Sequence, residues 1–542
     1  MPTGGDVLLQ CLQAQGVRAV FGMPGTQNIG VYDAFHRAPG LKHYLIRHEQ
    51  AATLMANGYA RACGQPAVAL TVPGPGASNA STGVVDAWTD GVPLLLIVGG
   101  YDRPVAHRDR AKMFHGLNQE EFFRPITRSF GCPNSVAEIP GVVEAAFRAM
   151  YRGRPGPVVI EIPPDVALET TDKFEVPAPV PRYTPAPVNP AAVQAAATAI
   201  RNMQRPVILV GRDCVPTGAG PLVEQLAERL EAPVIYGRLG KGVIADAHPW
   251  CAGYTRTKRT IALLREADGL IAVGTRFTQI DTLNWTLPVP ANLVQFDRDA
   301  RELGREYPIS AGVSGCPRQA LTDLLSLLGE PTRLEAHAAW SRRAQATIAE
   351  WKGMPPVDIQ GQIRQALPAD GLVSVDVTSL GYNCFDRFAV PDAHSLIYPA
   401  NSVTLGMAFP AAVGAKAAQP DRAVVSFSGD GGFLMACNEL ATAVEANLNV
   451  VAVVVRDNSL TAIKGSQQMA FAGRTVDTEM RSPDFAAMAR CFGAHGESTD
   501  DLRTLPERIA AGLARSGPSV IEVRLEGKDQ ELIAAIPWLH GE

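Results

Sequence analysis

Gly429-Asp430-Gly431-Gly432 and, further along, Asp457-Asn458-Ser459 decide the fold of this chain. Each cluster ends a short, β-branched apolar run, residues 423–428 before the first and residues 450–455 before the second. Such runs are typical of buried parallel strands, and residues 438–447 between them have the composition of a helix. Because open α/β sheets bind ligands at the carboxyl ends of their strands, this strand–helix–strand unit predicts a site there.

The acidic residues of the two clusters are predicted to lie side by side. Asp430 and Asp457 follow neighbouring strands, and adjacent carboxylates repel each other unless a cation lies between them. Mg²⁺ is usually held by one or two carboxylates together with phosphate oxygens. The glycine residues beside Asp430 leave backbone N–H groups open to a phosphate. The pattern therefore predicts a Mg²⁺–phosphate site. The alternative is a glycine turn with a solvated Asp in an unrelated Rossmann-like unit.

The paired clusters resemble the diphosphate-binding motif of thiamine diphosphate (ThDP) enzymes. The resemblance implies that Asp430 and Asp457 bind Mg²⁺ by their side chains and that Ser459 does so by its backbone carbonyl. Most relatives carry Asn where Asp457 stands, and Asp is also an oxygen donor. The resemblance also implies that these residues bind the cofactor: Gly429, Asp430, Gly431, Gly432 and Asn458.

A ThDP enzyme also needs a carboxylic acid that faces the pyrimidine ring of the cofactor and activates it. Glu49 follows a short apolar run, residues 43–46, and opens a predicted helix, although the helix dipole alone favours an acid there. The continuation, residues 71–80, resembles the pyrimidine domain of the acetolactate synthase and benzoylformate decarboxylase branch. The resemblance implies that Glu49 is the activating acid and that Pro73 and Asn79 contact the cofactor.

Residues 401–415 fit the same family. The resemblance implies that Leu405 wedges the cofactor into a bent shape and that the carbonyl of Val403 accepts a hydrogen bond from its pyrimidine amino group. An apolar core helix with a proline in its first turn is compatible with the same residues. Thr378 follows an apolar strand over residues 372–376, and the resemblance implies that it lies near the cofactor.

Bulk properties limit the class of protein. The chain has 542 residues, enough for three domains, and 46% hydrophobic residues, enough for a filled core. A net charge of −5 gives no basic footprint for nucleic acid, and no apolar stretch approaches a membrane span. Nine cysteines without a Cys-x-x-Cys pair favour reduced thiols over disulfides or zinc. Together with an N-terminus unlike a signal peptide, these features predict a cytoplasmic protein.

Two breaks predict three domains. Proline-rich residues 176–190 indicate an extended linker, and Gly353-Met354-Pro355-Pro356 indicates a second boundary. We therefore expect an α/β fold of three doubly wound parallel-sheet domains: an N-terminal pyrimidine-binding domain (1–175), a central Rossmann-like domain (191–330) and a C-terminal diphosphate-binding domain (356–542). Relatives bind FAD or an ADP group centrally, but the central glycine residues form no Gly-x-Gly-x-x-Gly after a strand, so FAD is not indicated here.

The substrate side departs from the relatives. The family resemblance places a loop with Phe114, His115 and Gln119 over the active centre, where acetolactate synthases commonly show Phe-Gln. An imidazole near the reactive ring exchanges protons near neutral pH, whereas the alternative is a solvated loop histidine. The histidine that benzoylformate decarboxylases carry on the strand after the Glu helix corresponds to Val72 here.

Residues after the metal motif bear on the second substrate. Acetolactate synthases place a Trp at the position of Ser466, so the smaller side chain leaves room for a larger or more polar acceptor. Lys464 is either an anion-binding residue or a solvated helix residue, and the second reading is favoured. Our leading hypothesis is therefore ThDP- and Mg²⁺-dependent decarboxylation of a 2-keto acid donor with ligation to a carbonyl acceptor. The alternative is a decarboxylase that releases an aldehyde. The resemblance further implies a homodimer or homotetramer.

Overall fold

The strand–helix–strand unit predicted around Gly429 is present in the structure, a computed structural model. Strands β15 (Val424–Gly429) and β16 (Val451–Arg456) pair in parallel, with Gly429 opposite Val455. Helix α18 (Leu440–Glu445) connects them in sequence. Asp430 and Asp457 therefore follow the carboxyl ends of two neighbouring strands. The structure describes residues 1–183, 185–329, 335–354 and 359–540.

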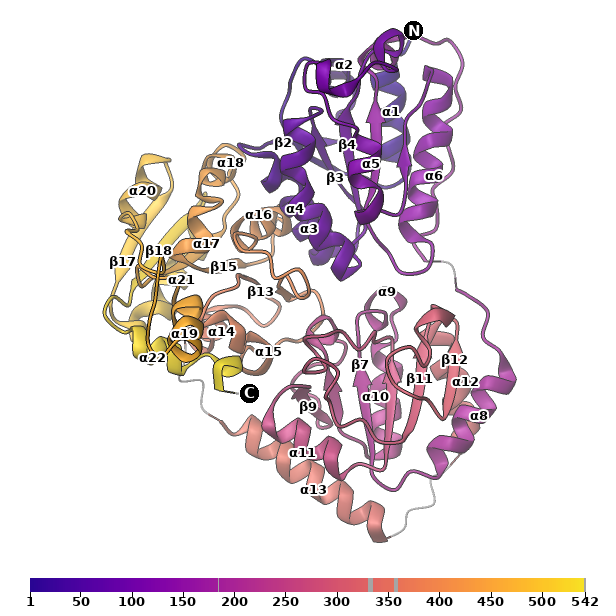
Figure 1. The fold of residues 1–542 in the computed structure, drawn as a ribbon, viewed down its shortest axis with the longest axis vertical. Helices are drawn as coiled ribbons and strands as arrows, with labels where there is room; N and C mark the ends of the chain where they lie inside the picture. Colours follow the sequence, from indigo (N-terminus) through magenta and orange to yellow (C-terminus); the bar gives the residue numbers. More distant parts are fainter. Residues whose placement is uncertain (184, 330–334, 355–358, 541–542) are drawn as a thin grey trace. The chain divides into compact units, whose positions relative to one another are not determined.

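In the described residues, the strands form three six-stranded sheets (Figure 1). The strand orders are β2-β1-β3-β4-β6-β5, β12-β11-β10-β7-β8-β9 and β14-β13-β15-β16-β18-β17. All pairs in the first two sheets are parallel, and so are the pairs of β15 with β13 and β16 and of β18 with β16 and β17. The remaining strand bounds are β1 (Ala19–Gly22), β2 (Lys42–Leu45), β3 (Ala67–Thr71), β4 (Leu94–Gly99), β5 (Phe130–Gly131), β6 (Val158–Ile162), β7 (Pro206–Val210), β8 (Val234–Tyr236), β9 (Cys251–Tyr254), β10 (Gly269–Val273), β11 (Asn292–Asp297), β12 (Ala311–Ser314), β13 (Leu372–Val375), β14 (Leu396–Ile397), β17 (His495–Thr499) and β18 (Ser519–Arg524).

Both faces of the first sheet are buried. Along β3, Ala67 and Ala69 belong to one apolar cluster, whereas Val68 and Leu70 belong to another. Alternate residues of a strand point to opposite faces, so helices cover both sides and the predicted doubly wound α/β fold is confirmed. The longer helices are α1 (Gly4–Ala14), α3 (Glu49–Cys63), α4 (Pro75–Asp90), α6 (Ile139–Tyr151), α8 (Pro190–Arg201), α10 (Gly220–Leu230), α11 (Lys258–Glu266), α12 (Pro317–Leu328), α13 (Glu335–Lys352), α14 (Ile359–Ala366), α16 (Ala408–Ala418), α19 (Thr461–Ala470), α20 (Phe485–Cys491) and α21 (Leu505–Leu513).

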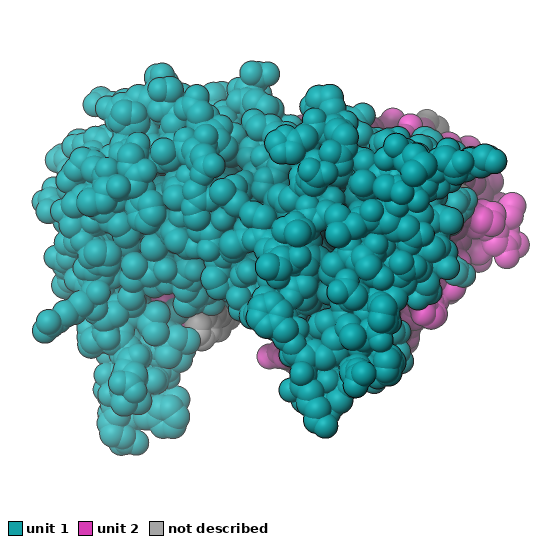
Figure 2. Space-filling model, turned by 90° about the horizontal axis from the view of Figure 1, so that it is seen from above, with its two compact units in different colours: residues 1–182, 366–381, 397–530 teal, residues 183–365, 382–396, 531–542 magenta. Residues whose placement is uncertain are grey.

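The chain divides into two compact units (Figure 2). Unit 1 comprises residues 1–182, 366–381 and 397–530, and unit 2 comprises residues 183–365, 382–396 and 531–542. The first sheet lies in unit 1 and the second in unit 2. None of the helices in the described part of the chain is both long and apolar enough to span a membrane.

The expected domain limits stay a prediction. In the expected linker, residues 176–183 and 185–189 form neither helix nor strand. Pro190 differs from the expectation because it begins α8, at the first helical position where the missing N–H costs nothing. The second expected boundary lies partly outside the described residues, since Pro355 and Pro356 are among those not described.

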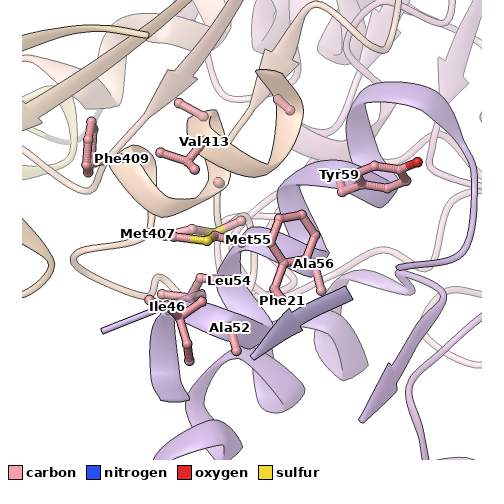
Figure 3. Packing of buried hydrophobic residues seen from close by; sticks show 14 of the residues in the cluster. Phe21, Ile46, Ala52, Leu54, Met55, Ala56, Tyr59, Met407, Phe409 and Val413 are labelled. Atoms are coloured by element: carbon pink, nitrogen blue, oxygen red, sulfur yellow. The ribbon is translucent and has the colours of Figure 1, made fainter. Parts of the chain in front are cut away.

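Helix α3 packs very closely on α16 within unit 1. A Cβ at Gly58 would lie 2.1 Å from the Ala411 carbonyl oxygen, and a Cβ at Gly414 would lie 1.9 Å from the Met55 carbonyl oxygen. Figure 3 shows Met55 of α3 beside Met407, which precedes α16. One apolar core therefore joins helices of the first and third sheets, and it fixes the helix that begins at Glu49.

Candidate active site

Asp430 joins the two sequence clusters that predicted the site. The residue is 1% exposed, and its Oδ1 accepts a hydrogen bond from the backbone N–H of Gly431 (2.9 Å). Its Oδ2 accepts from the N–H of Asn458 (2.9 Å) and from the hydroxyl of Ser482 (2.7 Å). Asn458 has a φ of 58°, in the left-handed region that Asn tolerates. Ser482 was not foreseen, because it lies beyond both motifs.

Asp457 lies beside Asp430 and is also buried. Burial raises the pKa of Asp457 to about 6, and the negative charge of Asp430 adds to that rise. The hydroxyl of Thr461 donates to Asp457 (2.6 Å), and the N–H of Ser459 donates to it at 3.3 Å; both lower the pKa. Two buried carboxylates that repel each other fit a divalent cation, because a cation removes the repulsion.

Oxygen donors beyond these two carboxylates are needed to complete a metal site. In the part of the chain that the structure describes, no group of three or more His, Cys, Asp and Glu residues is arranged to hold a metal ion. Ser459 is buried and lies two residues after Asp457 in the same turn, and its backbone carbonyl is the predicted third protein ligand. Phosphate oxygens of a cofactor would supply others.

Glycine residues keep the strand ends open for a phosphate group. A Cβ at Gly429 would lie 2.9 Å from Thr378 Oγ1, and a Cβ at Gly432 would lie 2.8 Å from Asp376 Oδ2. A Cβ at Gly431 would lie 3.1 Å from Leu460. A side chain at Gly429 or Gly432 would therefore press against Thr378 or Asp376, so glycine fits these two positions best. The residues present fit a bound diphosphate and Mg²⁺.

Asp376 holds the predicted cofactor loop at one end. Both of its carboxylate oxygens accept from the N–H of Gly406 at 3.1 Å. Burial raises the pKa of Asp376 to about 7. The loop presents Leu405, 36% exposed, and Val403, whose φ of 54° is costly for a β-branched residue. Sequence reasoning passed over Asp376, although its position after β13 matches those of Asp430 and Asp457.

A buried ion network holds the other end of this loop. Arg61 of α3 donates to Asp86 (2.9 Å) and Asp90 (2.7 Å) of α4, and all three side chains are buried. Asp90 also accepts from the N–H of Ala400 (2.9 Å), and Asp86 accepts from the hydroxyl of Ser402 (2.5 Å). The strained backbone at Val403 is therefore held between two anchored ends.

Glu49 is the first residue of α3, as predicted. The side-chain amide of Asn79 donates to its Oε2 at 3.0 Å. A Cβ at Gly76 would lie 3.4 Å from its Oε1, so the start of α4 lies against the carboxylate. Pro73 lies two residues before the first residue of that helix and is buried. The structure thus brings Glu49, Pro73 and Asn79 together at one end of the first sheet.

Glu439 holds the turn in front of Glu49. Its carboxylate is fully buried and accepts from the backbone N–H of Arg47 at 3.0 and 3.2 Å. The hydroxyl of Thr442 donates to Glu439 (2.6 Å) and also to the carbonyl of Leu45 (3.0 Å). Burial raises the pKa of Glu439 to about 7. No sequence motif singled out this residue.

His115 and Phe114 lie beside the same helix start. A Cβ at Gly74 would lie 2.5 Å from the His115 carbonyl oxygen, which also accepts from the Tyr101 hydroxyl at 2.6 Å. The His115 Nδ1 is buried and has no hydrogen-bond partner among the described residues. Phe114 is 70% exposed, stacks on the imidazole with ring centres 4.0 Å apart, and lines a cavity of about 350 Å³ with Tyr101.

The three residues expected on the substrate side have internal contacts. Gln119 is 1% exposed, and its amide nitrogen donates to the Gly99 carbonyl (3.1 Å) and to Glu161 (2.7 Å). Lys464 forms ion pairs with Glu479 (2.5 Å) and with Asp529. It is therefore not the solvated residue that we favoured, because its charge is already paired. The hydroxyl of Ser466 donates to the Ala462 carbonyl of its own helix (2.9 Å).

Comparison with known families agrees with this geometry. Three family models match, described as the thiamine pyrophosphate enzyme N-terminal TPP binding domain (residues 2–122), central domain (193–324) and C-terminal TPP binding domain (379–523). The chain therefore belongs to the thiamine pyrophosphate (ThDP) enzyme family, in the branch of the acetolactate synthases, as its motifs predicted. It is a ThDP-dependent enzyme.

Curated relatives span nearly the whole chain. The probable 2-ketoarginine decarboxylase AruI of Pseudomonas aeruginosa is 32% identical over 529 residues, 96% of this chain and 94% of that protein. The probable acetolactate synthase large subunit of Methanocaldococcus jannaschii is 30% identical over 551 residues, 96% of this chain and 92% of that protein. The acetolactate synthase isozyme 1 large subunit of Escherichia coli is 29% identical over 544 residues, 97% and 95%.

Proposed function

We propose that this enzyme removes CO₂ from a 2-keto acid and joins the remaining carbon fragment to a second carbonyl compound, with ThDP and Mg²⁺ as cofactors. The observation that carries the proposal is the pair of buried, adjacent carboxylates, Asp430 and Asp457, after parallel strands of the third sheet. Glu49, held by Asn79, supplies the separate acid that such an enzyme needs.

Each of these residues has a defined task. Bound ThDP would supply the nucleophilic carbon that attacks the keto group and accepts the charge left by CO₂. Asp430, Asp457 and the Ser459 carbonyl bind Mg²⁺, and the glycine backbone between Gly429 and Gly432 binds the diphosphate. Asn79 orients Glu49 through Oε2, which leaves Oε1 to share a proton with the pyrimidine ring of the cofactor.

The ligation half of the proposal rests on Ser466. Its hydroxyl is turned back onto the carbonyl of Ala462, so the side chain adds little to the wall where acetolactate synthases carry a Trp. Exposed Leu460 and Ile463 lie on or beside the same helix. A small residue beside exposed apolar groups favours a roomy acceptor site.

A decarboxylase that releases an aldehyde is the second candidate function. The observation that favours it is the buried Nδ1 of His115, which has no hydrogen-bond partner among the described residues and belongs to a side chain that can give or take a proton. The relative AruI, named as a probable decarboxylase, is consistent with the same outcome. His115 and Ser466 thus favour different fates for the same carbon fragment.

Product analysis separates the two candidates. The purified enzyme is incubated with ThDP, Mg²⁺ and either pyruvate or 2-ketoarginine as donor, with and without a 2-keto acid or aldehyde acceptor. Ligated hydroxy-ketone products support the proposal, whereas aldehyde alone, with every acceptor, overturns it. A Ser466→Trp variant is the matched control, because it is expected to reduce ligation to bulky acceptors while CO₂ release continues.

We further propose that the enzyme acts as a homodimer or homotetramer. Six large apolar side chains around α17 (Asp430–Leu434) and α19 are at least one-third exposed: Met435, Leu460, Ile463, Met469, Phe471 and Val476. Such concentrated apolar exposure is typical of a surface that a partner covers. A second copy of the chain is the expected partner, because the family resemblance joins Glu49 of one chain to the diphosphate site of another.

A further inference from the structure

A cavity of about 320 Å³ lies within unit 2, on the β8–β9 side of the second sheet. Arg238 follows β8, and the segment from Tyr254 to Arg259 runs from the last residue of β9 into the first turn of α11. Trp351 of α13 and Tyr382 also line the cavity and give it an aromatic side. In an open α/β sheet a nucleotide binds where the strand order reverses, which here is between β7 and β10. This cavity is therefore a different site.

Positive charge dominates the wall of the cavity. Arg238, Arg256, Lys258 and Arg259 line it, against two acidic residues, Glu350 and Asp386. The guanidinium of Arg259 forms an ion pair with Asp386 and lies 4.4 Å from the ring centre of Trp351. The charges of Arg259 and Asp386 therefore already balance each other. Arg256 interacts electrostatically with the buried Asp281, but its Nε is buried and has no hydrogen-bond partner among the described residues. An unpaired buried donor of this kind indicates a missing acceptor.

The start of α11 strengthens the attraction for an anion. This helix has nine residues, and its first two, Lys258 and Arg259, line the cavity. The side chain of Thr257 caps the helix by accepting from the N–H of Thr260, and Thr257 also lines the cavity. The positive end of a helix favours a negative group, and here it acts together with the basic side chains.

We infer that this cavity binds a small organic anion, with a carboxylate or phosphate group at Arg256 and the α11 N-terminus. Its short apolar body lies toward Trp351 and Tyr382. The volume is near the lower limit of small-molecule sites, which suits a metabolite and excludes a dinucleotide. The inference does not depend on the reaction proposed above, because none of these residues belongs to the candidate active site.

Calorimetry on the full-length enzyme tests the inference. ThDP and Mg²⁺ are kept at saturating concentration, so that the proposed diphosphate site is filled and does not bind the probes, and the probes are succinate, phosphoenolpyruvate and inorganic phosphate. We expect saturable binding at one site for at least one probe, weakened about tenfold or more in Arg256→Gln. If succinate is the only probe that binds, the site recognises a carboxylate group. If only phosphoenolpyruvate and inorganic phosphate bind, the site recognises a phosphate group.

Two further variants make the result decisive. Arg265→Gln changes an exposed arginine in the last turn of the same helix and is expected to bind like the wild type. Arg256→Lys keeps the charge but not the planar donor group, and is expected to bind with intermediate affinity. The inference is overturned if no probe binds the wild type at millimolar concentration, or if Arg256→Gln and Arg265→Gln bind equally well.

Discussion

Glu49 serves the proposed chemistry through its position, because Asn79 donates to its Oε2 while its Oε1 lies beside Gly76 in the first turn of α4. An amide at this position keeps the shape and most contacts but cannot share a proton with the cofactor. Replacing Glu49 by Gln should therefore affect turnover much more than cofactor binding, and measuring both tests the role of the carboxylate.

We expect Glu49→Gln to bind ThDP and Mg²⁺ within a few-fold of the wild type while kcat falls about 100-fold or more. Isothermal titration and steady-state CO₂ release measure the two effects. Glu120→Gln is the matched control, because Glu120 is also an acid in a first helical turn, on α5 (Gln119–Phe123), but is exposed. Unchanged turnover in Glu49→Gln would remove the role assigned to Glu49.

Asp457 and Asp430 are not equivalent, although both are proposed to bind Mg²⁺. Asp430 also accepts hydrogen bonds from Asn458 and Ser482 and thereby joins the two motifs. We expect Asp457→Asn to keep Mg²⁺ affinity within about tenfold, because an amide oxygen is still a donor. Asp430→Asn is expected to lose most affinity, because its amide group cannot accept the same bonds. Titration of Mg²⁺ in the presence of ThDP distinguishes them, and equal losses would contradict this assignment.

At the scale of the element, the loop over residues 400–406 is held between Asp90 and Asp376. Replacing Asp90 by Asn keeps the Arg61–Asp86 pair but places an NH2 group where Asp90 accepts from the backbone N–H of Ala400 or Asn401, so a buried donor loses its acceptor. We expect Asp90→Asn to lower the free energy of unfolding by about 1–3 kcal/mol. Denaturant unfolding measures the change.

The control for this variant is Asp33→Asn, which removes an exposed ion pair with Arg37. Exposed pairs contribute little, so we expect a loss below about 1 kcal/mol. A loss of similar size in both variants would show that the Arg61 network does not carry the stability assigned to it.

Glu439 predicts a pH dependence of stability at the turn before Glu49. Its pKa in the folded protein is about 7, above the ordinary value for Glu, because the carboxyl is buried. Between these two pKa values the folded state binds more protons than the unfolded state, so this group lowers stability as pH rises. Above the pKa of the folded state, the contribution of this group to the free energy of unfolding no longer changes with pH.

We therefore expect the wild type to lose about 2 kcal/mol of unfolding free energy relative to Glu439→Gln between pH 5 and pH 8. Glutamine keeps an acceptor for the N–H of Arg47 and does not titrate, so the difference isolates one group. Denaturant unfolding at the two pH values gives the comparison. A constant difference would mean that Glu439 does not titrate in this range.

The sequence predicts some of these elements better than others. Asp430, Asp457 and Glu49 were placed correctly at strand ends and at a helix start, because β-branched runs and turn residues are local signals. The Arg61–Asp86–Asp90 network and the contact of Glu439 with Arg47 join residues far apart in the chain, and no local pattern encodes them. The pairing of Lys464 was misjudged for the same reason, since its partner Asp529 is distant in sequence.

At the scale of the whole molecule, the exposed apolar side chains around α19 require an explanation. Phe471 is 54% exposed and Val476 is 67% exposed, in the same unit as the proposed cofactor site. Leaving such groups in water is unfavourable, and covering them in an assembly recovers that free energy. The proposed homodimer or homotetramer accounts for this exposure.

We expect Phe471→Glu to shift the enzyme toward monomer, because a buried, unpaired charge opposes association. Mass photometry at nanomolar concentration measures the shift, and turnover at the same dilutions is expected to fall with the assembled fraction. Leu168→Glu is the matched control, since Leu168 is 56% exposed on α7 (Pro164–Leu168), away from α19 in sequence. A fully active monomer would show instead that one chain completes the active site alone, and that Glu49 and Asp430 of the same chain act together.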